Sequence, residues 1–225
     1  MPKPTANTAP PSNTPVESEI KFNLTATNKS SVPGLQFFSV FPPELKSVAP
    51  KQQQLVTALV SGPTTQASSP QILTWKGGTG ALTLLAFRGT SLQSFQTTPV
   101  SLGESVTVSW SQGAFAFARI EGASKDKVAV TFASGTPTDG FIGLTVGPAP
   151  ILLSIPKSLT PLSLEPDLSP TVTVVFGTPF EFPCPNQSDL SKATSVHFAQ
   201  GSGCGGLTYS AQINVGPEDV IVQIG

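Results

Sequence analysis

The sequence predicts an all-β protein, most simply a single antiparallel β-sandwich of Greek-key or jelly-roll type with a proline-rich N-terminal arm. Runs of alternating apolar and polar residues indicate strands with one buried face. These runs recur about every 8 to 12 residues, separated by turns rich in Gly, Pro and Asp, as in sandwiches and barrels. A chain of 225 residues can bury a sizeable core as one domain. We therefore expect an arm over residues 1–18 and one sandwich over 19–225.

The N-terminal arm is followed by a first pair of strands. Five prolines among Thr, Asn, Ser and Ala favour extended conformers that bury nothing, so we expect a flexible arm that orders only in an assembly. Residues 20–26 alternate at period 2 and predict a strand. A turn over 28–34 and a second strand over 35–41 complete a predicted hairpin.

The central part of the chain predicts further strands. Residues 51–60 fit a short helix or a strand, and we favour a strand. Residues 71–75 and 81–87 predict a hairpin around a glycine-rich turn. From Glu104 onward, the alternation predicts a four-strand meander at 104–110, 114–119, 127–132 and 141–146.

The segment 147–170 carries six prolines spaced among Leu and Ile. The apolar residues need cover, so we expect an extended proline-rich crossing outside the sandwich, or a segment packed on a second subunit. Strands are expected again at 171–176 and 219–224, and a hairpin over 194–215 around the glycines of 201–206.

Composition limits the classes of partner. Charged residues make up 11% of the chain and the net charge is -1, so copies of the protein repel each other weakly. The same balance lacks the long-range attraction that nucleic-acid binding needs. The sequence contains no apolar run of 18 residues, the length that a membrane-spanning helix needs, so no membrane span is predicted. The N-terminus lacks the apolar region of a signal peptide. Composition favours an extracellular location or the surface of an assembly, and the compartment itself stays open.

The stretch 194–215 holds the residues most suggestive of chemistry, including the single His197. Its G-x-G-x-x-G spacing at 201–206 precedes a predicted strand, whereas dinucleotide binding needs a helix there. His197 with Ser195, Asp189 or Cys204 suggests a hydrolase, but Ser195 and His197 would lie on one strand face with Cβ atoms roughly 7 Å apart. A zinc site would have to combine His197, Cys184, Cys204 and a distant carboxylate. We therefore expect no catalytic, cofactor-binding or metal-binding residues.

Three other sets of residues are candidate sites. Cys184 and Cys204 bracket 19 residues, and a disulfide between them would stabilise by roughly 3 kcal/mol in an oxidising compartment; whether they are paired or free stays open. N-glycosylation patterns occur at Asn23, Asn28 and Asn186. The side chains that could stack on a sugar are Trp75, Trp110 and Tyr209, although core packing is the commoner use of such residues.

The sequence thus favours a non-enzymatic structural protein that associates with copies of itself into an oligomer, filament or dense assembly. The alternative is a lectin-like β-sandwich module that binds a glycan. A hydrolase that uses His197 ranks third.

Residues 22–30, FNLTATNKS, and 34–43, GLQFFSVFPP, resemble the start of a group of small bacterial proteins related to a rhizosphere-expressed protein. Val174-Val175-Phe176-Gly177 is similar to a later segment of that group. The group's tryptophan-rich middle is absent, since Trp75 and Trp110 are the two tryptophans of this chain. The resemblance implies a β-rich protein and transfers no catalytic residues.

Overall fold

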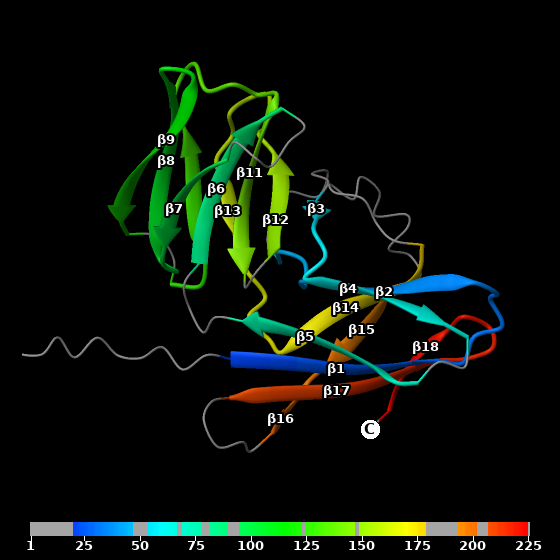
Figure 1. The fold of residues 1–225 in the computed structure, drawn as a ribbon. Coiled ribbons are helices and arrows are strands. Elements are labelled where there is room, and N and C mark those ends of the chain that lie inside the picture. Colours follow the sequence, from blue (N-terminus) through cyan, green and yellow to red (C-terminus); the bar gives the residue numbers. More distant parts are fainter. Residues whose placement is uncertain are drawn as a thin grey trace, which may run out of the picture.

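The computed structural model describes residues 20–46, 54–66, 69–77, 82–89, 95–122, 125–146, 149–178, 193–201 and 207–224. Within these ranges the regular structure is entirely β, arranged as four sheets that we call A to D (Figure 1). The all-β prediction is therefore confirmed. The arm at 1–18 lies outside the described residues.

Sheets A and B face each other in the lower part of Figure 1. Sheet A has the order β16–β17–β1–β5, with β18 also on β17; the strands are β16 (Ala199–Gly201), β17 (Thr208–Val215), β1 (Ile20–Asn28), β5 (Gln71–Gly77) and β18 (Ile221–Ile224). Sheet B has the order β15–β14–β2–β4, formed by β15 (Thr194–His197), β14 (Thr171–Gly177), β2 (Leu35–Phe41) and β4 (Val60–Thr65).

Sheets C and D form the upper part of Figure 1. Sheet C has the order β3–β12–β11–β6–β7, formed by β3 (Gln54–Val56), β12 (Ala149–Ser154), β11 (Gly140–Val146), β6 (Leu82–Arg88) and β7 (Gln96–Val100). Sheet D has the order β13–β10–β8–β9, formed by β13 (Leu162–Leu164), β10 (Val128–Phe132), β8 (Glu104–Ser111) and β9 (Ala114–Glu121).

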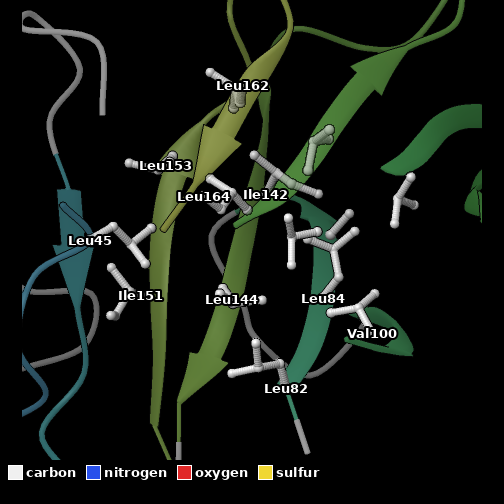
Figure 2. Close-up of a cluster of buried hydrophobic side chains, with 14 of the residues drawn as sticks. Leu45, Leu82, Leu84, Val100, Ile142, Leu144, Ile151, Leu153, Leu162 and Leu164 are labelled. Carbon is white, nitrogen blue, oxygen red and sulfur yellow. The ribbon is translucent and has the colours of Figure 1, made fainter. Parts of the chain in front are cut away.

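Two large hydrophobic clusters hold the sheets together. We call the first the A–B core; its buried members include Leu24, Phe38, Val174 and Ile213. The second, the C–D core, is mostly aliphatic, and Figure 2 shows Leu82, Leu84, Val100, Ile142 and Leu144 pointing into it. The single sandwich of the sequence prediction is not confirmed, because the sheets are distributed around two cores.

Sheet B contributes to both cores. In β2, Phe38 and Val40 belong to the A–B core, whereas Phe41 belongs to the C–D core. In β14, Val174 and the adjacent Val175 divide in the same way. Since neighbouring strand residues point to opposite faces, one face of sheet B is buried against sheet A, and part of its other face, around Phe41 and Val175, packs on the C–D core.

Strand positions follow the predicted alternation, but several partners differ from the prediction. Strands β1 and β2 lie in different sheets, as do β5 and β6, so the two N-terminal hairpins are wrong. The meander is wrong beyond β8 and β9, because β10 pairs parallel with β8 and β11 pairs with β6. The β1–β17 pair is also parallel, so the sheets are not purely antiparallel. The alternation of apolar and polar residues shows which face of a strand is buried, but it does not show which strand is its partner. A longer turn allows the next strand to join another sheet.

The proline-rich segment enters the sheets instead of only crossing them. β12 lies between β11 and β3 with Ile151, Leu152 and Leu153 buried, and β13 pairs with β10. Pro150 occupies a strand position opposite Thr145. Most apolar residues of this segment thus find cover within the chain itself, whereas Leu168 stays 57% exposed.

Candidate functional site

The stretch 194–215 crosses from one sheet to the other. β15 forms an edge of sheet B, the buried Phe198 follows, and β16 begins pairing in sheet A. β16 and β17 are antiparallel, so this half of the predicted hairpin is confirmed. Residues 202–206, including Cys204, lie outside the described residues. Because a strand follows them, the helix N-terminus that pyrophosphate binding needs is not formed there.

His197 is held by hydrogen bonds with Thr171 and Gln223. Its Nδ1 lies 3.0 Å from the Thr171 hydroxyl, on the neighbouring strand β14. Ser195 and His197 are both exposed and flank the buried Val196, so they share the outward face as predicted. Asp189 lies outside the described residues, as does Cys204. The imidazole is therefore paired with the hydroxyl of Thr171, a residue outside the predicted hydrolase set.

Two of the three candidate sugar-stacking residues pack inside the A–B sandwich. Phe22 is stacked between Trp75 and Tyr209, with ring centroids 5.4 Å and 5.2 Å away. The three rings stand side by side on neighbouring strands, since Phe22 pairs in register with both residues. Phe198 packs edge-on against Phe22 and Trp75. Trp75 is buried, at 7% exposed, so its ring face is taken by the core.

Trp110, the third candidate, is half-buried at the end of β8. Phe115 packs edge-on against it at 4.9 Å, and the Arg88 guanidinium lies 5.8 Å from its ring centroid. Arg88 also pairs with Asp139, with Nη2 2.7 Å from Oδ2. The hydrogen bond between the two side chains raises the pKa of Arg88 and lowers that of Asp139. Trp110 therefore lies beside a charged pair at the surface.

The predicted glycosylation and disulfide residues are placed unevenly. Asn28 is fully buried, and its Oδ1 accepts a hydrogen bond from the Ser30 N–H at 3.0 Å, which leaves no room for a glycan on this side chain. Asn23 is half-buried and accepts from the Thr74 hydroxyl at 3.1 Å. Cys184, Cys204 and Asn186 lie outside the described residues.

The described ranges contain no group of three or more His, Cys, Asp or Glu side chains that could hold a metal ion. Nor does this part of the chain include a helix that could cross a lipid bilayer.

Side chains close several strand edges. The Gln223 amide binds the edge of β15: its Oε1 accepts from the His197 N–H at 3.0 Å, and its Nε2 donates to the His197 carbonyl at 2.6 Å. The buried Gln54 binds the N–H and carbonyl of Leu45 in the same two-handed way, at 3.0 and 3.2 Å. Gln223 thus takes the place of a neighbouring strand for one residue of β15, whereas Gln54 binds a residue of the segment that follows β2.

The edges of sheets C and D are joined similarly. The Phe115 N–H in β9 donates to Gln96 Oε1 in β7 at 3.3 Å, and Arg119 Nη1 donates to the Pro99 carbonyl at 3.0 Å. The sequence does not predict the roles of these glutamines, because an isolated Gln gives no local sign of which backbone it binds. Unpaired strand edges invite pairing with other chains, and these contacts reduce that exposure.

Two sheet faces turn away from the cores and carry few charges. We call the first the A face; its outward residues on β1, β5, β17 and β18 are Lys21, Asn23, Thr25, Thr27, Ile72, Thr74, Lys76, Thr208, Ser210, Gln212, Asn214, Val222 and Ile224. We call the second the D face; its outward residues are Ser105, Thr107, Ser109, Ser111, Ala114, Ala116, Ala118, Ile120, Ala129, Thr131 and Ser163. The polar half of the alternating runs in β1, β8 and β17 already indicated these faces, whereas the outward half of β9 is Ala and Ile.

The two faces differ in chemistry. The D face is built from small Ser, Thr and Ala side chains plus Ile120, which is 60% exposed. On the A face, Ile72, Val222 and Ile224 are 66%, 56% and 41% exposed. Ile72 and Ile224 end the same cross-strand row, whose central members are Thr25 and Gln212.

Comparison of the chain with protein-family models, with curated proteins and with solved structures finds no match.

Proposed function

We propose that this protein is a non-enzymatic structural protein that associates with copies of itself, and that it does so through sheet faces and not through strand edges. The observation that carries the proposal is the pair of nearly uncharged outer faces. The D face presents no charged side chain at its described strand positions, and the A face presents two lysines at one end.

The scarcity of charged side chains on both faces lowers the free-energy cost of bringing two faces into contact. Burying an unpaired charge costs several kcal/mol, whereas hydroxyl and amide groups can re-form hydrogen bonds across a contact. Small side chains on the D face permit close approach of a second sheet. The low overall charge adds little long-range repulsion between copies.

The closed edges determine which kind of association is favoured. Gln223, Gln96 and Arg119 bind backbone groups that would otherwise be free to pair with a strand of another molecule. Pro63 lies within the edge strand β4 and lacks a donor N–H. Uncontrolled edge-to-edge growth is thereby disfavoured, and contact between faces remains.

Sedimentation velocity over a concentration series up to the millimolar range, with electron microscopy of the most concentrated samples, tests the proposal. We expect the weight-average mass to rise with concentration. Association should persist in 1 M NaCl, because the centres of both faces are uncharged and salt screens only surface charges. A strict monomer throughout the series would overturn the proposal.

The second candidate is a carbohydrate-binding module, and the observation in its favour is Trp110 beside the Arg88–Asp139 pair. An aromatic ring with adjacent polar groups is a common way to hold a sugar. Retention on a glycan array that is lost in Trp110→Ala, and kept in the exposed control Phe95→Ala, would support this function. Absence of retention for the wild-type protein would remove it.

A further inference from the structure

Three exposed aliphatic side chains lie on the A face, although this face is otherwise polar. Ile72, Val222 and Ile224 are among the most exposed large hydrophobic residues of the described chain. Ile72 and Ile224 belong to one row across the sheet, with Thr25 and Gln212 between them. The row therefore places an apolar side chain at each margin and neutral polar groups in the middle.

The charges near the A face are separated toward the two ends of its strands. Lys21 and Lys76 are paired in register at one end. The other end carries Lys29 and the β17–β18 turn with Glu218 and Asp219, all exposed. Over the described residues, the first end therefore carries two positive charges, and the second carries two negative charges and one positive charge.

We infer that the A face binds the A face of a second copy of this chain around a two-fold axis that lies along the Ile72–Ile224 row. Rotation about this axis places Ile72 opposite Ile72 of the partner, and Ile224 opposite Ile224. It also reverses the strand direction, so the lysine end of each copy meets the acidic turn of the other. An axis parallel to the strands would instead bring the two lysine ends together, and like charges in contact disfavour it.

The size of the face sets the strength of this contact. β1 has nine residues, and four strands lie side by side, so the face covers roughly 500–600 Å² at about 3.3 Å per residue and about 4.8 Å between strands. Stable interfaces bury about 800 Å² on each partner. The A-face dimer is therefore a weak one that forms at high protein concentration, as one contact within a larger assembly.

The inference rests on the proposed self-association, and a matched pair of variants separates the two. Thr25→Arg places a charge on the two-fold axis, at a half-buried threonine on an inner strand of sheet A. Thr107→Arg makes the same change at a half-buried threonine on an inner strand of sheet D. Circular dichroism and thermal unfolding establish that both variants fold, and sedimentation equilibrium measures the dimer dissociation constant.

We expect Thr25→Arg to weaken dimerisation by at least about 100-fold, because two guanidinium groups would face each other across the axis. Thr107→Arg should leave the A-face dimer unchanged, because Thr107 lies on the D face. If the wild type dimerises and Thr25→Arg dimerises equally well, the A-face inference is overturned and self-association stands. If the wild type stays monomeric at every concentration, self-association itself fails.

A second pair of variants tests the reversed strand direction. Lys21→Glu and Glu218→Lys should each weaken the homodimer by about 3- to 10-fold, since every exposed contact occurs twice in a two-fold dimer. An equimolar mixture should regain part of the affinity, because the changed ends then meet opposite charges. A mixture that associates no better than the two single variants would contradict this arrangement.

Discussion

The A–B core and the C–D core solve the same packing problem with different side chains and different parts of the chain. The A–B core includes a set of aromatic rings around Phe22 and Trp75, whereas the C–D core is mostly Leu, Ile and Val. Sheets C and D come mainly from one continuous stretch between β6 and β13, apart from β3. Sheets A and B join strands from both ends of the chain.

This difference shows how the two cores depend on each other. Sheet B packs on both, through Phe38 and Val174 on one face and Phe41 and Val175 on the other. The C–D sheets therefore lie between strands of the A–B sandwich in sequence, and against sheet B in space.

Truncation of the C–D core should have the largest effect. Leu144 is fully buried, and Leu144→Ala should lower the free energy of unfolding by about 2–5 kcal/mol. Because sheet B is shared, we expect both cores to lose stability together. Urea unfolding followed in two single-tryptophan backgrounds, Trp110→Phe and Trp75→Phe, reports each core separately. A transition at Trp75 that does not shift would contradict the coupling.

Two glycines, one in sheet C and one in sheet A, allow the packing of the two cores to be compared at single contacts. A Cβ on Gly143, in sheet C, would lie 2.5 Å from the Ile151 carbonyl oxygen. A Cβ on Gly77, in sheet A, would lie 2.6 Å from the edge of the Phe22 ring. Backbone yields less than a ring, so Gly143→Ala should cost about 1–3 kcal/mol and Gly77→Ala less. Thermal unfolding of both variants checks the order, and equal costs would speak against it.

The two-handed glutamines should differ because one is buried and one is exposed. Gln54→Met leaves the backbone N–H and carbonyl of the buried Leu45 without this partner, at a cost of about 2–3 kcal/mol. Gln223→Met exposes the His197 backbone to water and should cost less than about 1 kcal/mol. Hydrogen exchange at the Leu45 and His197 amides, with urea unfolding, measures both. A larger loss for Gln223→Met would refute the burial argument.

The smallest expected effect is on the stability of the folded protein at low pH. Burial alone would raise the pKa of Asp167, but hydrogen bonds from Ser169 and Lys46 outweigh it and hold this pKa below its ordinary value. A carboxyl with a lowered folded pKa stabilises above its unfolded pKa of about 3.9, and this contribution is lost as the pH falls through the folded pKa. Asp167→Asn should therefore flatten the acid side of the stability profile by less than about 1 kcal/mol. A profile identical to that of the wild type, from pH 6 to pH 2, would count against this role.

The strands themselves could be predicted from alternation, and the buried residues of β1, β8 and β17 lie where that pattern places them. The pairing of those strands could not be predicted. Alternation is local, whereas the partner of β1 is β17, far along the chain, and nothing in either run identifies the other. The two hairpins predicted for 20–41 and 71–87 failed for this reason.

The candidate site could be predicted only as far as local spacing allows. Ser195 and His197 share a face because their spacing of two residues fixes it in any strand. That Trp75 is enclosed by Phe22 and Phe198 depends on contacts between distant strands, as does the binding of Gln223 to His197. The polar positions of the A and D faces were visible in the sequence, but their union into continuous surfaces required the order of the strands.

Because β1 pairs with β17, sheet A can be completed only near the end of the protein's synthesis. Lys21 leaves the ribosome long before its partner Thr208, by roughly 10–40 s at about 5–20 residues per second. The residues of sheets C and D are synthesised within that interval, while one side of β1 waits for the last strands of the chain. Nascent chains that meet on the same messenger RNA at this stage would do so before sheet A is finished.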